Sequence, residues 1–486
     1  MFFKFCLFLI FIYSVSGLGR NLLMSNSYKA NFFDKNLSSE PLFLTPLIKA
    51  GKLNEARNKS HIVDLPGLPD ELKNMESYSG YITTDYKCNN NLFFWNIRAL
   101  NGNPKAPLFI WLQGGPGVSS LFGLFVEHGP FSVTKDNKLQ FNPNTWAQKY
   151  SILYIDNPVG TGFSFTDRDE CYATNEDDVA DNLFEFLSQF YILFDEFRGV
   201  PLFVSGESYG GKYVPALTQK IIEETFITEA LGINLVGMAI GNGFSDPMNM
   251  LDYGLFLEMI GLANDAEAQN FMSATALAKI EISMKKYDQA FDIFDSMMDG
   301  DLTPYPTYFH NITGYDYYLN FLQPKQPDSF TYFNNYLSLT NVRDAIHVGN
   351  KTFNDGKLTE IHLKSDVMKD VCDRVTFILN NHIPTVFYSG NLDIIVASVL
   401  TIQFLNQLSW EGQIPYVNAF KHRYDFKDDI AGYVQLYKNL VYASLRKAGH
   451  IVPYDQPEVS RDMIDKFVKY SLAYDKGTDR PGSSFL

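Results

Sequence analysis

Short runs of hydrophobic residues recur along the chain, and most carry apolar side chains at consecutive positions rather than at alternating ones. They occupy residues 108–112, 152–155, 201–204, 235–240, 384–388 and 441–445. Continuous apolar runs of this length predict strands buried on both faces, as in a parallel sheet covered by helices. Residues 78–83 and 92–100 predict two further strands, and an Asn-Gly-Asn-Pro turn joins the second of them to residues 108–112.

Helical patterns lie between these runs. Residues 176–194 predict a helix between two of the strands, and a second helix is expected to follow residue 210 and continue to Thr225. Strands that alternate with helices favour an α/β fold with a mostly parallel sheet flanked by helices.

The alternation stops over residues 246–369, which are helical, rich in Met and Tyr, and include Pro-rich loops. We expect this segment to be an inserted helical cap. The predicted organisation is a signal peptide (1–16), an N-terminal lead or propeptide without evident strand or helix patterning (17–69), the first part of the core (70–245), the cap (246–369), the second part of the core (370–475) and a mobile polar tail (476–486).

The first residues have the composition of a secretory signal: Lys4, an apolar stretch over residues 5–13, and small residues before a cleavage site near Ser16. The stretch is too short to span a bilayer, and no other segment is long enough. Asn-x-Ser/Thr sequons predict glycosylation at Asn36, Asn58, Asn311 and Asn350. We therefore expect a secreted or lysosomal protein without a membrane span.

The composition of the chain limits the kinds of ligand that the protein is expected to bind. The formal net charge of −15 over 486 residues argues against nucleic acid, because binding to a phosphate backbone needs clustered Lys and Arg. No metal-binding motif is present, so neither a metal nor a cofactor is expected. After removal of the signal peptide the chain keeps Cys88, Cys171 and Cys372, which allows at most one internal disulfide. Which cysteines pair, and whether the protein forms a homodimer, stay open.

The clearest chemical motif is Gly206-Glu207-Ser208-Tyr209-Gly210, directly after the apolar run 201–204. The Gly-x-Ser-x-Gly pattern between a strand and a helix is typical of a nucleophile elbow, in which a sharp turn exposes the serine hydroxyl. By itself the pattern also fits an ordinary strand-to-helix turn. Whether Ser208 is a nucleophile therefore depends on whether the chain also supplies a base and a carboxylate.

Those partners follow in the chain order of an α/β-hydrolase. Asp393 comes after the run 384–388, and His450 comes after the run 441–445. A base oriented by a carboxylate is what a serine needs to become a nucleophile. Backbone N–H groups of Tyr209 and of the Gly-rich loop 113–117 are expected to form the oxyanion hole.

Together these motifs resemble the serine carboxypeptidase family over most of the mature chain. The matching segments are residues 111–120, 157–164, 206–213, 241–243, 448–450 and 455–457. Gln113 and residues 125–130 are most similar to the vitellogenic-like members.

The resemblance implies an α/β-hydrolase fold and an exopeptidase that removes single residues from peptide C-termini through an acyl-enzyme. It assigns Ser208, Asp393 and His450 to the triad and Gly115 and Tyr209 to the oxyanion hole. It also places Trp111, Gln113, Glu127 and Glu207 around the substrate carboxylate, with Gln113 where an Asn is usual.

Two adjacent carboxyls cannot both ionise cheaply, so one can keep a proton and donate it to a hydrogen bond with that carboxylate. We therefore expect acid conditions to favour activity. Two alternatives remain: an acyltransferase or non-peptide hydrolase with the same triad, and a non-catalytic binding or chaperone-like protein that uses the cap.

Overall fold

A ten-stranded sheet forms the centre of the molecule in the computed structural model, which describes residues 40–475. In spatial order the strands are β1 (Ser77–Asp85), β2 (Asn90–Ile97), β6 (Ser151–Ile155), β3 (Leu108–Leu112), β8 (Pro201–Glu207), β9 (Asn234–Gly241), β11 (Thr385–Gly390), β14 (Leu440–Leu445), β13 (Asp429–Tyr437) and β12 (Lys421–Phe426). The signal peptide, Asn36 and the tail lie outside the described residues.

The six central strands, from β6 to β14, run parallel, and two antiparallel strands extend the sheet at each end. Every residue of β3, β6 and β11 is buried. This is the burial that consecutive apolar residues predict, because helices cover both faces of a parallel sheet. The predicted α/β fold with a mostly parallel sheet is confirmed. The β12–β13 hairpin was not anticipated.

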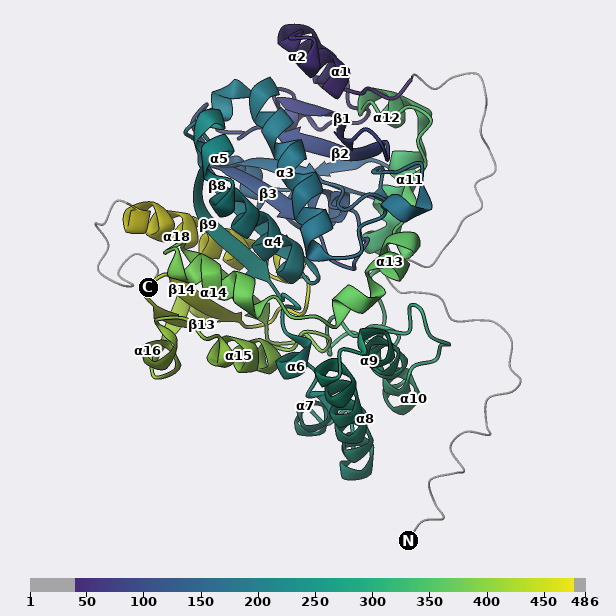
Figure 1. Cartoon of the computed structure of the whole chain (residues 1–486), viewed down its shortest axis with the longest axis vertical. Helices are drawn as coiled ribbons and strands as arrows, with labels where there is room; N and C mark the ends of the chain where they lie inside the picture. The colour runs from purple at the N-terminus through teal and green to yellow at the C-terminus, as the bar shows by residue number, and fades with distance from the viewer. Residues whose placement is uncertain (1–39, 476–486) are drawn as a thin grey trace.

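Helices cover the sheet on both faces (Figure 1). Phe203 of β8 packs its ring against Phe467 of α18 (Pro457–Asp475), 5.8 Å between centroids. Gly206, at the opposite parity of the same strand, faces Val214 of α4 (Gly210–Glu223). Since successive residues of a strand point to opposite faces, α4 and α18 lie on opposite sides of the sheet.

Further helices and short strands connect and flank these strands. They are α3 (Glu176–Leu193), α5 (Thr225–Leu231), α14 (Cys372–Asn380), α15 (Ser398–Gln407), α16 (Gln413–Val417), α17 (Val452–Asp455) and the short strands β4 (Phe131–Val133), β5 (Leu139–Phe141), β7 (Thr161–Gly162) and β10 (Asn354–Asp355). Helix α3 begins at Glu176, as predicted, because the Asn175 side chain accepts hydrogen bonds from the first N–H groups.

Residues 246–369 leave the sheet after β9 and are mostly helical. The helices are α6 (Pro247–Met250), α7 (Tyr253–Met259), α8 (Asp265–Ser283), α9 (Tyr287–Phe294), η6 (Asp295–Asp299), α10 (Tyr308–Thr313), α11 (Tyr332–Ser338), α12 (Thr340–Ala345) and α13 (Lys357–Val367). The helices from α6 to α10 project from the lower end of the molecule in Figure 1, whereas α11, α12 and α13 lie along the side of the sheet. The buried Lys212 ammonium of α4 donates to the backbone carbonyls of Asp366 (2.6 Å) and Val367 (2.8 Å). The end of α13 is thereby fixed against the helix that follows Ser208.

The start of the described chain packs against the sheet edge. Residues 42–44 pair with Tyr81 of β1, with Leu44 N donating to Tyr81 O (2.9 Å) and Tyr81 N donating to Leu42 O (2.9 Å). Two short helices follow, α1 (Thr45–Lys49) and α2 (Leu53–Ser60). Neither helix has a hydrophobic pattern that predicts it, because helices this short depend on tertiary packing. Covering β1 also protects the backbone groups of an edge strand.

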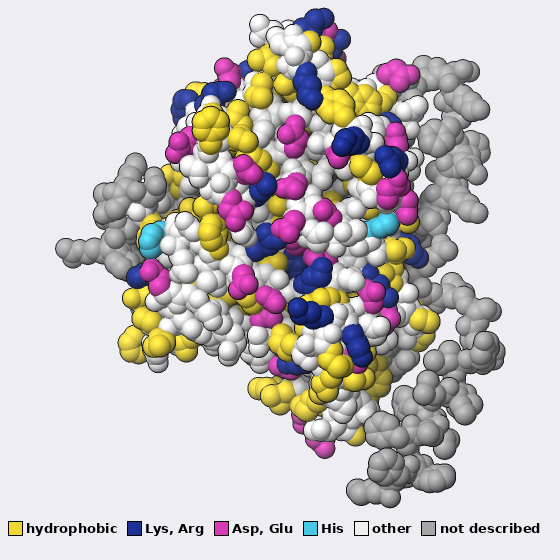
Figure 2. Space-filling model, in the orientation of Figure 1, with side chains coloured by type: hydrophobic (Ala, Val, Ile, Leu, Met, Phe, Trp, Pro, Cys, Tyr) yellow, Lys and Arg dark blue, Asp and Glu magenta, His cyan; other side chains and the backbone are white. Residues whose placement is uncertain are grey.

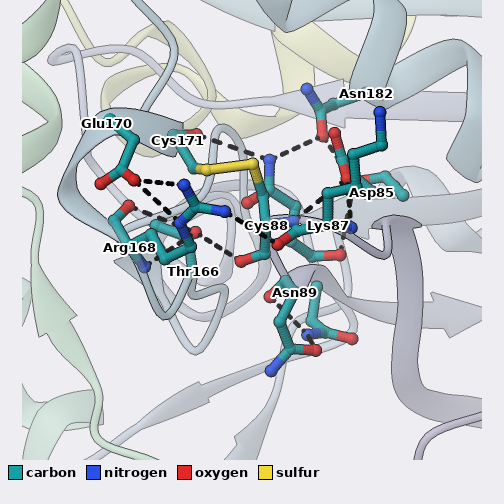
Figure 3. The surroundings of a disulfide bond; sticks show 12 residues. Asp85, Lys87, Cys88, Asn89, Thr166, Arg168, Glu170, Cys171 and Asn182 are labelled. Carbon is teal, nitrogen blue, oxygen red and sulfur yellow. Dashed lines mark hydrogen bonds and ion pairs between the residues drawn. A yellow bond between two sulfur atoms is a disulfide. The ribbon is translucent and has the colours of Figure 1, made fainter.

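Cys88 and Cys171 form a disulfide (Figure 3). Cys372 is free and half-buried. The disulfide ties the β1–β2 turn to the segment before α3, where Arg168 also pairs with Glu170. On the face shown in Figure 2, acidic and basic side chains are interspersed, and hydrophobic side chains gather toward the lower end of the molecule. Among residues 40–475, no helix is both long and apolar enough to cross a membrane.

Candidate active site

Ser208 lies at the sharp turn between β8 and α4, with a φ of 60°. This left-handed conformation is unusual for a residue with a side chain, and such strain persists only where the surroundings enforce it. Here Ser208 N donates to Gly241 O (3.0 Å), and Ser208 O accepts from Gly211 N (2.8 Å) and Phe244 N (2.9 Å). The turn therefore holds the serine at the carboxyl end of the parallel strands, as a nucleophile elbow requires.

The two glycines of the motif are needed because the end of β3 passes close to the turn. A Cβ at Gly206 would lie 2.3 Å from Leu112 O, and one at Gly210 would lie 2.6 Å from the same oxygen. No side chain fits at either distance. The Gly-x-Ser-x-Gly spacing thus reflects contact with a neighbouring strand, which the sequence motif does not reveal.

Asp393 and His450 come together from the loops after β11 and β14. His450 Nδ1 lies 2.7 Å from Asp393 Oδ2, and both side chains are buried. Asp393 also accepts from Asn242 Nδ2 (2.6 Å) and from Val396 N (3.2 Å). These contacts fix the carboxylate and leave His450 Nε2 as the ring nitrogen available to a substrate or nucleophile.

Ser208 and His450 line one cavity, together with Gly115 and Tyr209. Among the described residues no hydrogen bond joins the Ser208 hydroxyl to His450. Catalytic hydrogen bonds are often long in a ligand-free site and shorten when substrate binds.

The loop after β3 presses against the elbow. A Cβ at Gly114 would lie 2.5 Å from Ser208 Cβ and 2.6 Å from Tyr209 N. Gly115 follows with a φ of +109°. Among the described residues, the N–H groups of Gly115 and Tyr209 have no hydrogen-bond acceptor. Two unpaired N–H groups beside a serine are the donors that an oxyanion hole supplies.

Next to Ser208, the side chains of Trp111, Gln113, Glu127 and Glu207 form a buried polar cluster. Trp111 Nε1 donates to Gln113 Oε1 (2.8 Å), and Gln113 Nε2 donates to Glu207 Oε1 (3.1 Å). The indole thus sets the orientation of the amide, so that its NH2 group faces Glu207. Neither oxygen of Glu127 has a hydrogen-bond partner of normal geometry among the described residues.

Burial disfavours the charged form of both carboxyls. It raises the pKa of Glu127 to about 8. Burial, followed by the nearby charge of Glu127, raises the pKa of Glu207 well above its usual range. At neutral and acid pH the pair therefore holds protons that it can donate to a hydrogen bond with an anion.

The sequence profile of the serine carboxypeptidase family (peptidase S10) matches residues 66–470 of the chain. The chain is 44% identical over 467 residues to the human "probable serine carboxypeptidase CPVL", covering 95% of each chain. It is 44% identical to the venom serine carboxypeptidase of Apis mellifera, covering 88% of this chain and 90% of the relative. It is 42% identical to the vitellogenic carboxypeptidase of Aedes aegypti, again covering 88% and 90%.

The chain belongs to the serine carboxypeptidase family. Among solved structures it is similar to Kex1(delta)p, a prohormone-processing carboxypeptidase from Saccharomyces cerevisiae, with a TM-score of 0.70 and 25% identity. The match covers 84% of this chain and 94% of that one. This carboxypeptidase is therefore a hydrolase of the exopeptidase class with an α/β-hydrolase fold.

Sequence reasoning left two features of this site unassigned. One is the role of Asn242, whose side chain bonds Asp393; residues 241–243 matched the family without a function being given to them. The other is a group of carboxyls from residues 246–369, Asp299, Asp301 and Glu360, which lines the cavity beside Ser208. The pattern Asp299-Gly300-Asp301 was visible in the sequence, but its distance from Glu360 along the chain hid the cluster.

Proposed function

We propose that Ser208 is the nucleophile of this carboxypeptidase, that His450 is its base and that Asp393 orients the imidazole. The observation that carries the proposal is the position of Ser208, held at a positive φ between two unpaired N–H groups and in one cavity with His450. Because Nδ1 faces Asp393, the proton of the serine hydroxyl passes to Nε2.

The reaction then proceeds through an acyl-enzyme. The Ser208 oxygen attacks the carbonyl carbon of the last peptide bond, and the N–H groups of Gly115 and Tyr209 bind the oxygen that becomes negative. His450 returns its proton to the nitrogen of the departing amino acid. Water, deprotonated by His450, hydrolyses the ester and regenerates Ser208.

The buried polar cluster recognises the free C-terminal carboxylate. A protonated Glu127 or Glu207 donates a hydrogen bond to it, and the Gln113 amide and the Trp111 indole support that arrangement. A neutral carboxyl is required because two buried carboxylates facing a third would repel it. Substrate binding is therefore favoured between about pH 3.5, where the substrate carboxyl ionises, and about pH 8, where Glu127 loses its proton.

Labelling with an organophosphonate tests the nucleophile. We expect a covalent adduct on Ser208, and Ser208→Ala is expected to lose both the adduct and the hydrolysis of blocked dipeptides. Ser273→Ala, in an exposed position of α8, serves as the matched control and should keep both. An adduct on another serine, or full activity of Ser208→Ala, would refute the assignment.

We also infer that the protein passes through the secretory pathway and is secreted or delivered to lysosomes. The Cys88–Cys171 disulfide supports this, because such bonds persist in oxidising compartments. The sequon residues Asn58, Asn311 and Asn350 are exposed, as glycan attachment requires. Treating protein from eukaryotic cells with an endoglycosidase should lower its apparent mass, and an unchanged mass would contradict glycosylation at these sites.

A further inference from the structure

Three acidic side chains of the cap line the cavity that contains Ser208 and His450. They are Asp299, Asp301 and Glu360, and one carboxylate oxygen of each lies within 4.8 Å of the others. None of them belongs to the triad, the oxyanion hole or the carboxylate-binding cluster. Their position beside the nucleophile places them where a substrate side chain would lie.

The buried side chain of Asp295 holds the loop that carries Asp301. The buried carboxylate of Asp295 accepts the backbone N–H groups of Asp301 (2.9 Å), Leu302 (3.1 Å) and Thr303 (2.5 Å). These bonds fix the loop that follows η6, so that Asp299 and Asp301 face the cavity. Asp299 also accepts a hydrogen bond from the Tyr318 hydroxyl.

Glu360 is the member of the group without a partner. It extends from α13 and is 4% exposed. Its side chain makes no hydrogen bond or ion pair with any described residue. A carboxyl that is almost wholly enclosed, has no protein partner and lines a cavity is free to accept hydrogen bonds from a ligand in that cavity.

The surroundings of these three carboxyls disfavour their charged forms, and a cation bound among them would stabilise those forms. Burial first, and then the neighbouring carboxyls, Asp295 included, raise the pKa of Asp299 to about 7 and that of Glu360 to about 9. Burial also raises the pKa of Asp301. The groups that oppose these shifts are Lys357, near Asp301 and Glu360, and His450, near Asp299.

We propose that Asp299, Asp301 and Glu360 bind the positively charged side chain of a peptide substrate, the lysine or arginine that directly precedes the C-terminal residue. The proposal rests on the proposed function, because it uses Ser208 as the point at which the peptide is cleaved. The cavity walls fit such a side chain. Phe291, Phe294 and Val367 provide apolar surface for its aliphatic part, and the carboxyls provide hydrogen-bond acceptors for its charged end.

The position of the cavity decides which substrate residue enters it. It is lined by Ser208, His450 and Gly115, but by none of the four residues of the carboxylate-binding cluster. The side chain in this cavity therefore belongs to the residue whose carbonyl is attacked, on the far side of the scissile bond from the free carboxylate. The apolar walls also favour an organic cation over a metal ion, which would retain polar ligands or water.

Steady-state kinetics on two pairs of blocked dipeptides test the proposal. In the first pair, lysine or norleucine precedes a C-terminal phenylalanine; in the second, lysine or norleucine is itself C-terminal. Norleucine keeps the aliphatic chain of lysine and removes only the charge. We expect kcat/KM for lysine to exceed that for norleucine by about tenfold or more in the first pair, since hydrogen bonds to charged groups have this strength.

Substitutions of the acidic side chains then test whether these residues cause the preference for lysine. Glu360→Gln is expected to lower the lysine-to-norleucine ratio about tenfold, and Asp301→Asn should lower it in the same direction. Glu229→Gln makes the same chemical change on the exposed surface of α5 and should leave the ratio at its wild-type value. The rate of phosphonate labelling at Ser208 verifies that each variant retains a folded site.

Equal rates for lysine and norleucine in the wild type would overturn the proposal. So would discrimination only at the C-terminal position, or an unchanged ratio in both folded variants. Activation of norleucine hydrolysis by calcium that is lost in Glu360→Gln would identify a metal site and would also overturn it. Absence of hydrolysis of all four dipeptides, together with unlabelled Ser208, would refute the proposed function itself.

Discussion

Replacing Glu127 by glutamine should remove the alkaline limit of peptide hydrolysis. The buried Glu127 carboxyl has its pKa raised to about 8 by burial, and it can donate a hydrogen bond to the substrate carboxylate only while protonated. The amide of Glu127→Gln keeps a donor of similar size and cannot ionise. The variant therefore separates the need for a donor from the need for a proton.

The expected magnitude follows from proton linkage. If substrate binds only to the protonated pair, kcat/KM of the wild type falls about tenfold for each pH unit above about 8, because this parameter reports the ionisation of the free enzyme. In Glu127→Gln the profile should stay level over the same range, apart from the ionisation of Glu207. At pH 5 the two proteins should differ by no more than about tenfold, since a neutral donor is present in both.

The same substitution predicts a change in stability with pH. In the unfolded chain Glu127 ionises near its ordinary pKa of 4.5, whereas in the folded protein it keeps its proton to about pH 8. The unfolded state therefore binds fewer protons across this window, so the contribution of Glu127 to the free energy of unfolding falls as pH rises from 4.5 to 8. At about 1.4 kcal/mol per pKa unit, the loss approaches about 5 kcal/mol. Glu127→Gln should accordingly gain stability relative to the wild type as pH rises.

The assay is hydrolysis of a blocked dipeptide from pH 4 to 9.5, with denaturant unfolding at pH 5 and pH 8 on the same preparations. Glu229→Gln, on the surface of α5, should follow the wild type in both measurements. A descending limb that persists unchanged in Glu127→Gln would refute the role of this proton. A wild-type profile that stays level up to pH 9.5 would refute it as well.

Four further outcomes are expected. Asp393→Asn should lower kcat about 10⁴-fold with little change in KM, because the imidazole loses its orienting carboxylate; a loss below tenfold in rapid-quench kinetics would contradict this. Asn242→Ala removes the 2.6 Å bond to Asp393 and should lower kcat about tenfold, whereas Asn242→Asp adds a negative charge beside Asp393 and should be worse. Replacing both Cys88 and Cys171 by serine should reduce the free energy of unfolding by about 4 kcal/mol, since the bridge closes a loop with a sequence separation of 83; unchanged denaturant midpoints would contradict it. Lys212→Met should destabilise the protein by about 3 kcal/mol, because it leaves the carbonyls of α13 without their buried donor, and a native-like thermal midpoint would exclude that anchoring role.

Much of the fold could be predicted because the sequences of the central strands are themselves recognisable as buried strands. The runs that became β3, β6 and β8 are apolar at nearly every position, and a covered parallel sheet is the environment that such runs require. The β12–β13 hairpin escaped prediction because an edge strand with exposed Lys421, His422 and Arg423 lacks an apolar run. Likewise, α1 and α2 are too short to have a helical period of their own.

The residues from which a serine hydrolase site could be assembled are recognisable in the chain alone, because the glycine spacing around Ser208 and the order of Asp393 and His450 can be read directly. What surrounds these residues depends on contacts between distant segments. Asn242 and Asp393 are 151 residues apart, yet they meet at 2.6 Å because the ends of parallel strands converge at one edge of the sheet. Glu360 reaches Asp299 and Asp301 for a different reason: α13 packs back onto the core through Lys212, and no sequence pattern records that contact.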